Sequence, residues 1–218
     1  MDILEILTHV DHTLLKADAT WPDIDRLCRE AVDYHTASVC IPPRFVARAR
    51  AAYPDLNICT VIGFPLGYSV LSSKAEEARQ AIADGANEID MVIDIGAARE
   101  HNYDYLAQEI RELRDVTRGH ILKVIIETCY LNEEEKVALC ELVTDCEADY
   151  IKTSTGFGSA GATLEDVKLF TRHIGPEVRI KAAGGIRTQE DMEAYLAAGA
   201  DRIGASAAVK LAEAARDL

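Results

Sequence analysis

The chain has 218 residues, of which 49% are hydrophobic and 28% are charged, and its formal net charge at pH 7 is −14. This composition is that of an ordinary globular domain, and it excludes a disordered or fibrous chain. A surface this acidic repels phosphate backbones, so we expect no nucleic acid and no anionic membrane among the partners.

The cysteines and the N-terminal segment indicate the cellular compartment in which the protein is expected. The six cysteines form no C-x-x-C pair and no cysteine–histidine group with zinc spacing, so no metal site is predicted. The first residues, MDILEILTHVDH, carry acids inside their apolar run, unlike a signal peptide. No apolar stretch approaches the roughly 20 residues of a membrane span. We therefore expect free thiols in a reducing cytoplasm.

Short β-branched runs alternate along the chain with longer amphipathic patterns of helical period. After a short extra helix at Asp2–Leu7, strands are predicted at Asp11–Lys16, Ala37–Ile41, Asn57–Gly63, Glu88–Ile95, Ile121–Thr128, Tyr150–Thr155, Arg179–Ala183 and Arg202–Ala205. The clearest helices are predicted at Trp21–Tyr34, Ser72–Asp84, Tyr103–Val116, Asn132–Cys146, Leu164–His173, Gln189–Ala198 and Ala207–Asp217. Asn132 and Thr188 each precede an acid three residues later, as N-cap residues do.

The number and spacing of these units indicate the fold. Eight strand–helix units spaced roughly 20–30 residues apart imply parallel strands joined by helical crossovers. We predict an α/β protein in which residues 1–218 form a single catalytic domain, a (β/α)₈ TIM barrel with a short extra N-terminal helix. An open doubly wound sheet is the alternative.

Several predicted strands carry charged side chains where a buried strand should be apolar. Barrel strands point alternate residues toward the axis. In Glu88–Ile95 the apolar set should face the helices, which turns Glu88, Asp90 and Asp94 toward the axis. We favour Asp90 as a proton carrier and interpret Asp94 as a loop or capping carboxylate. In the fifth strand Lys123 and Glu127 share a face. They either support the catalytic residues or belong to a layer of ion pairs that fills the barrel interior.

Two lysines, Lys152 and Lys181, precede the glycine-containing turns KTSTG and KAAGG at the carboxyl ends of the sixth and seventh strands. Active sites of this fold are built at these strand ends. Burial and a second ammonium both disfavour the charged form of an amine, so one lysine can become a nucleophile that forms an iminium with a carbonyl. The alternation of residues does not say which lysine attacks.

Glycines mark the loops that follow the last two strands. Gly184 and Gly185 follow the seventh strand, and Gly204 and Ser206 end the eighth. Small residues here let backbone N–H groups approach an anion, and these two loops are the usual phosphate site of the fold. Ordinary tight turns are the alternative interpretation.

Six segments, spread over almost the whole chain, resemble the deoxyribose-phosphate aldolase family: DHTLLK, EIDMVI, KVIIET, YIKTSTGFG, KAAGGIRT and ADRIGAS. The resemblance implies a class I aldolase that needs no metal and no cofactor. It would reversibly cleave 2-deoxy-D-ribose 5-phosphate to acetaldehyde and D-glyceraldehyde 3-phosphate, in deoxyribonucleoside catabolism. The implied partners are a small phosphorylated sugar or aldehyde and further copies of the chain, in a homodimer or tetramer.

The family pattern also assigns roles to residues of this chain. Lys152 would form the Schiff base, Lys181 would help to keep that amine neutral and to transfer protons, and Asp90 would join the proton relay. Residues expected to bind substrate are Asp11, Thr13, Cys40, Lys123, Thr155, Gly156, Gly184, Gly185, Gly204 and Ser206. The chain departs from the pattern at Ala207, where a second serine is frequent, so one phosphate contact would be missing.

Two other functions compete with this assignment. One is another Schiff-base aldolase or transaldolase on a barrel, with a ketose phosphate as donor. The other is a catalytically silent barrel that binds sugar phosphates. The presence of Asp90, Lys152 and Lys181 together argues against a silent barrel.

Overall fold

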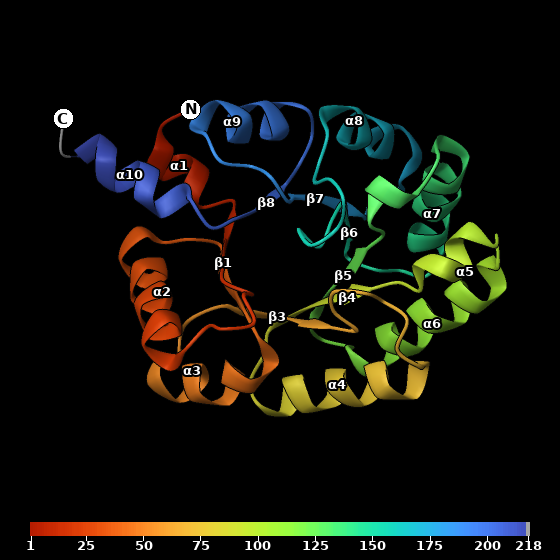
Figure 1. The fold of residues 1–218 in the computed structure, drawn as a ribbon, viewed down its shortest axis with the longest axis horizontal. Helices are drawn as coiled ribbons and strands as arrows, with labels where there is room; N and C mark the ends of the chain where they lie inside the picture. Colours follow the sequence, from red (N-terminus) through yellow and green to blue (C-terminus); the bar gives the residue numbers. More distant parts are fainter. Residues whose placement is uncertain (217–218) are drawn as a thin grey trace.

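The computed structural model describes residues 1–216, in which eight parallel strands form a closed barrel inside a ring of helices (Figure 1). The strands are β1 (Val10–Thr13), β2 (Ser38–Ile41), β3 (Ile58–Ile62), β4 (Glu88–Val92), β5 (Ile121–Ile125), β6 (Tyr150–Lys152), β7 (Arg179–Ala183) and β8 (Arg202–Ala205). They follow one another in chain order, and β8 closes onto β1, where Gly204 pairs with Asp11. The predicted (β/α)₈ barrel is confirmed, and the open doubly wound sheet is wrong.

Helices cover the outside of the barrel within residues 1–216 (Figure 1). They are α1 (Ile3–Leu7), α2 (Trp21–Tyr34), α3 (Val46–Ala52), α4 (Leu71–Ala83), α5 (Ile95–Arg99), α6 (Tyr103–Val116), α7 (Glu133–Asp145), α8 (Leu164–His173), α9 (Gln189–Ala197) and α10 (Ala208–Arg216). Asn132 and Thr188 cap α7 and α9 as predicted, since their side chains accept hydrogen bonds from the backbone N–H of Glu135 and Asp191. None of these helices is long and apolar enough to cross a membrane.

Several predicted boundaries are wrong at the carboxyl ends of the strands. The predicted first, fourth, fifth and sixth strands each run three residues too far, because the chain leaves the ladder there to form the mouth of the barrel. The sequence also misses α3 and α5. α5 is hidden because the run from Asp90 to Ile95 looks like one strand, whereas Asp94 caps the helix by accepting a hydrogen bond from Ala97 N–H at 3.0 Å. Asp217, at the end of the last predicted helix, lies outside the described residues.

The barrel separates an apolar layer from a charged one. Ile89, Met91 and Ile93 are buried against the helices, in the continuous hydrophobic core between strands and helices. Glu88 and Asp90, the alternate residues of β4, are equally buried but form ion pairs inside the barrel. The predicted alternation in β4 is therefore confirmed.

A second buried ion pair, between α4 and α6, fixes the carboxyl end of β4. Lys74 Nζ lies 2.5 Å from Glu109 Oε1, and both side chains are fully buried. Lys74 also donates to Val92 O at 2.8 Å, and the other Glu109 oxygen accepts from Asp94 N–H at 3.1 Å. The pair thus ties both helices to the backbone just beyond Asp90.

Candidate active site

Asp90 lies at the centre of a network of buried lysines inside the barrel. Its Oδ2 accepts hydrogen bonds from Lys152 Nζ at 2.8 Å and from Lys181 Nζ at 2.7 Å. Its Oδ1 accepts from Lys123 Nζ at 2.8 Å and from the Cys59 thiol at 3.1 Å. The two lysines singled out in the sequence are therefore close neighbours that share one carboxylate oxygen.

The register of the parallel strands brings these groups together. Lys152 of β6 pairs with Lys181 of β7, and Lys123 of β5 pairs with Asp90 of β4. Paired residues of neighbouring parallel strands point to the same face of the sheet. Charged residues at these alternate positions therefore all point into the barrel.

Two further carboxylates complete the network. Asp11 lies 2.5 Å from Lys181 Nζ and 2.5 Å from Arg202, and it accepts a hydrogen bond from Ser38 at 2.7 Å. Glu88 pairs with Lys123 and lies 3.2 Å from Arg202. We call this set, made of Asp11, Glu88, Asp90, Lys123, Lys152, Lys181 and Arg202, the charged layer.

Protonation in the charged layer follows from burial and from opposite charges. Burial raises the pKa of Asp90, but Lys123, Lys152 and Lys181 outweigh it and hold this pKa well below its ordinary value. Burial lowers the pKa of Lys181, but Asp11 and Asp90 outweigh it and raise this pKa above its ordinary value. Asp90 is thus a carboxylate and Lys181 an ammonium at neutral pH.

The charged layer is not balanced when all its members are ionised. Lys123, Lys152, Lys181 and Arg202 then supply four positive charges against three negative ones from Asp11, Glu88 and Asp90. An uncompensated charge is costly in a dry interior. The layer becomes neutral when one lysine loses its proton.

A cavity of about 260 Å³ opens above this layer at the carboxyl ends of β1, β6, β7 and β8. Among the residues predicted to bind substrate, those that line it are Thr13, Thr155, Gly156, Gly184, Gly185, Gly204 and Ser206. Lys152 lines the cavity as well, whereas Lys123 and Lys181 do not. Of the three lysines on Asp90, only Lys152 is therefore open to a ligand in this cavity.

The glycines of the cavity wall are required for two different structural reasons. Gly184 and Gly185 have φ of +86° and +79°, a left-handed conformation that favours glycine. Gly204 has no such φ, but a Cβ there would lie 2.8 Å from Ala183 Cβ and 3.3 Å from Lys181 Cε. Gly204 thus makes room for Ala183 and Lys181, a role that its sequence context did not reveal.

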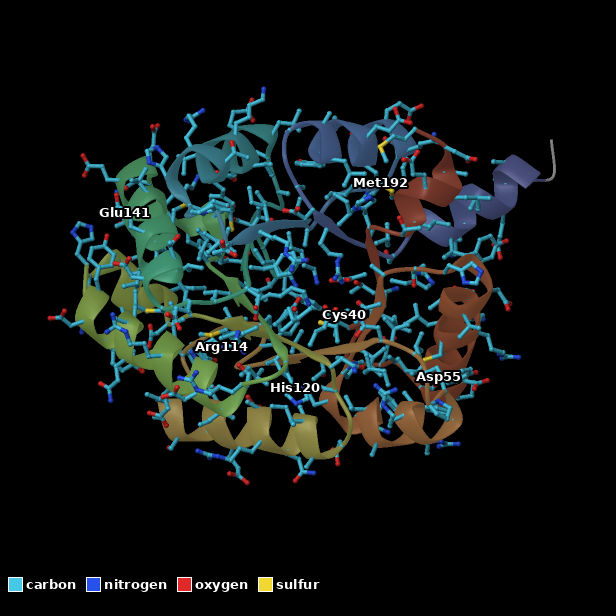
Figure 2. All side chains as sticks on the ribbon, turned by 180° about the vertical axis from the view of Figure 1, so that it is seen from behind. Cys40, Asp55, Arg114, His120, Glu141 and Met192 are labelled. Carbon is cyan, nitrogen blue, oxygen red and sulfur yellow. The ribbon has the colours of Figure 1, made fainter. Side chains whose placement is uncertain are left out.

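Cys40 and Asp11 belong to the interior of the barrel and do not line this cavity. Figure 2 shows Cys40 near the centre of the barrel, while Glu141 lies on the outer helix α7. Cys40 pairs in register with Cys59, and both thiols lie within 4.8 Å of an Asp90 oxygen. Thiols and carboxylates are metal donors, but this carboxylate is already bound to three ammonium groups.

Some residues of the site were missed or misplaced by the sequence analysis. Arg202 and Ser38 bind Asp11 but were assigned no role from the sequence, although Arg202 lies in the segment ADRIGAS; both share an alternation with inward-facing residues. Glu127 was expected on β5 beside Lys123, yet it lies beyond the end of the strand with φ of +52°. It contacts Thr155 instead.

Comparison with known proteins places this geometry in a family. The family model described as "DeoC/LacD family aldolase" matches residues 6–211. A deoxyribose-phosphate aldolase of Clostridium botulinum strain Eklund 17B is 59% identical over 212 residues, which cover 97% of this chain and 96% of that protein. The deoxyribose-phosphate aldolase of Clostridioides difficile strain 630 is 52% identical over 207 residues, covering 94% of each chain.

Solved structures agree with the sequence relatives. The tetrameric deoxyribose phosphate aldolase of Aeropyrum pernix superposes with a TM-score of 0.88 at 31% identity, covering 99% of this chain and 92% of that one. The similarity thus extends over nearly the whole length of both chains.

Proposed function

The chain belongs to the DeoC/LacD family of aldolases, and from this premise we propose that it reversibly cleaves 2-deoxy-D-ribose 5-phosphate to acetaldehyde and D-glyceraldehyde 3-phosphate. The reaction proceeds through a Schiff base on Lys152. One observation carries this assignment: Lys152 is the lysine that both lines the cavity and donates to Asp90 beside Lys181.

The charged layer prepares Lys152 to act as the nucleophile. Loss of its proton makes the layer neutral, while Lys181 and Lys123 keep theirs because the carboxylates around them raise their pKa despite burial. The free amine attacks C1 of the open-chain sugar, and water leaves to give an iminium. Asp90, 2.8 Å from this nitrogen, is placed to relay the protons that these steps move.

The iminium then acts as an electron sink for cleavage of the C2–C3 bond. The C3 hydroxyl loses its proton, the C2–C3 electrons pass into the iminium, and glyceraldehyde 3-phosphate leaves as the aldehyde. The remaining enamine takes a proton at C2, and hydrolysis frees acetaldehyde and returns the amine of Lys152. The same steps in reverse join the two aldehydes.

The phosphate is bound at the end of the cavity formed by Gly156, Gly185 and Ser206. In residues 1–216 the backbone N–H groups of Gly156 and Gly185 have no hydrogen-bond acceptor, so they are free to donate to a phosphate. Asp11, which is bound to Lys181, Arg202 and Ser38, supports the charged layer beneath the substrate.

A borohydride trap tests the proposed function. The protein is incubated with acetaldehyde and reduced, and its peptides are mapped by mass; the peptide with Lys152 should gain about 28 Da, the mass of an ethyl group. Label on another lysine, or none, would reject the assignment. In a parallel assay acetaldehyde should support carbon–carbon bond formation with glyceraldehyde 3-phosphate, whereas activity with dihydroxyacetone phosphate as the donor would indicate the transaldolase-like alternative.

Assembly and location are part of the proposal. The Aeropyrum pernix relative is a tetramer, and we propose that this chain also forms a homo-oligomer, a dimer or a tetramer. All six cysteines lie within the described residues and are free thiols, which suits a cytoplasmic enzyme. Size-exclusion chromatography with light scattering gives the assembly directly.

A further inference from the structure

Glu127 is a buried carboxylate in a strained position next to the cavity. It lies just beyond β5, is 1% exposed, and has φ of +52°, a left-handed conformation that is unfavourable for a residue other than glycine. It is not among the residues that line the cavity. Backbone strain of this kind persists where the surrounding structure holds the residue in place. For Glu127 that surrounding structure is the loop after β6.

The carboxylate of Glu127 holds this loop at two points. Its Oε1 accepts a hydrogen bond from the backbone N–H of Thr155 at 3.1 Å, and its Oε2 accepts from the Thr155 hydroxyl. The Thr155 oxygen in turn accepts from the backbone N–H of Phe157 at 3.0 Å. Both N–H groups that flank Gly156 are thereby occupied within the protein.

The loop also packs tightly onto Glu127. A Cβ at Gly158 would lie 2.8 Å from Cys129 Sγ and 3.1 Å from Glu127 Cδ, so a side chain there would displace one of them. Gly156, between the two held residues, has φ of +86° and lines the cavity. Its own N–H has no acceptor within the described part of the chain.

We propose that Glu127 is a positioning residue for phosphate recognition: it fixes Thr155 and Phe157 so that the intervening N–H of Gly156 is presented to the substrate phosphate. The Thr155 hydroxyl donates its proton to Glu127, so this loop contributes to the phosphate through its backbone. Glu127 itself touches neither the substrate nor Lys152. The inference rests on the proposed function, since it assumes a phosphorylated substrate in this cavity.

The test compares the phosphorylated and the unphosphorylated sugar. In Glu127→Ala the KM for 2-deoxyribose 5-phosphate should rise by about tenfold or more, the effect of losing hydrogen bonds to a charged group. Cleavage of 2-deoxyribose and borohydride trapping of acetaldehyde on Lys152 should change by less than about threefold, because neither uses a phosphate. Equal losses with both sugars would overturn the proposal.

Further variants separate positioning from folding. Glu127→Gly removes the carboxylate and also the backbone strain, so it should be more stable than Glu127→Ala yet show the same rise in KM. Glu127→Gln keeps one acceptor and should give an intermediate KM.

Glu135→Gln is a matched control, since Glu135 is also buried and its carboxylate accepts a hydrogen bond from the backbone N–H of Asn132 at 2.7 Å, but it contacts no part of this loop. A Glu135→Gln variant with the same rise in KM would reject a specific role of Glu127.

Inorganic phosphate serves as a probe that does not depend on turnover. Phosphate should raise the melting temperature of the wild type, and its apparent Kd should be about tenfold weaker in Glu127→Ala and unchanged in Glu135→Gln. A wild type that binds phosphate but does not cleave 2-deoxyribose 5-phosphate would reject the proposed function and leave this inference testable. Equal phosphate binding by the wild type and Glu127→Ala would reject the inference alone.

Discussion

Lys152 and Lys181 are register partners on β6 and β7, and both donate to the same oxygen of Asp90, at 2.8 Å and 2.7 Å. Two amines on one carboxylate oxygen interact strongly with each other. The ammonium of Lys181 therefore acts at close range on the amine of Lys152, and this coupling leads to the first prediction.

Lys181→Met should slow iminium formation on Lys152. The variant removes the cation that shares the Asp90 oxygen with Lys152, and it leaves three positive and three negative groups in the charged layer when all are ionised. Borohydride trapping of acetaldehyde at pH 7 should slow by at least about tenfold, because a neighbouring proton-transfer partner is lost. The measurement is the trapping rate of the wild type and the variant at pH 7. Lys168→Met, on the exposed face of α8, is the control; an unchanged trapping rate in Lys181→Met would contradict the prediction.

Asp90→Asn should separate iminium formation from turnover. The amide cannot carry protons as the carboxylate does, so kcat should fall by about 10² to 10⁴. Trapping on Lys152 should persist, because the amine that forms the iminium is unchanged and still lines the cavity. The free energy of unfolding should also fall, by about 3 kcal/mol, because buried cations lose a partner. Asp94→Asn is the control: asparagine also caps helices, so both activity and stability should stay close to wild type. Loss of trapping in Asp90→Asn would be inconsistent with this division of roles.

Asp11→Asn should remove stability that is fully present above about pH 4 and declines progressively as the pH falls further. Burial raises the pKa of Asp11, but Lys181, Lys123 and Arg202 outweigh it, so its folded pKa lies below the unfolded value of about 3.9. A group with a lowered pKa stabilises the fold above its unfolded pKa and loses this contribution as pH falls through the folded one. The variant should therefore be about 3 kcal/mol less stable at pH 7, and the gap to wild type should narrow below pH 4. Urea unfolding from pH 3 to pH 8 measures this gap. A gap that stays constant down to pH 3 would contradict the prediction.

The Lys74–Glu109 pair should matter for both stability and rate. Lys74→Met leaves the buried Glu109 carboxylate without its cation, which should cost about 3 kcal/mol or more in the free energy of unfolding. The double variant Lys74→Met/Glu109→Leu should recover most of that loss, because no buried charge remains. Both should lower kcat, since the backbone beyond Asp90 loses its hydrogen bonds to these side chains. Glu76→Gln, which breaks an exposed pair with Arg79, should change stability by less than about 0.5 kcal/mol.

Much of the fold was predictable from local pattern. The alternation in β4 separates Ile89 and Met91 from Glu88 and Asp90, and the structure confirms that the first pair faces the helices and the second the interior. The carboxyl ends of several strands were not predictable, because β-branched residues and the alternation of side chains continue after the hydrogen-bonded ladder ends. Asp94, for example, continues the alternation of β4 but lies beyond the strand, where it caps α5.

The candidate site was predictable where residues carry a motif and not where they act through contacts across the barrel. Lys152, Lys181 and Asp90 lie in recognisable segments, and the structure brings them together. The choice between the two lysines needed the cavity, because alternation points both inward. Arg202 lies 191 residues from Asp11 in the chain, and a contact at that separation depends on closure of the barrel rather than on any local pattern.

The charged layer also limits how the barrel can be redesigned. Each of its members compensates others on different strands, so the charge balance around the nucleophile is a collective property of the layer. An attempt to widen the interior for bulkier aldehydes should replace residues in charge-neutral sets, such as a lysine together with a carboxylate. A library that varies these positions one at a time would mostly sample enzymes with an unpaired charge in the interior and a less stable barrel.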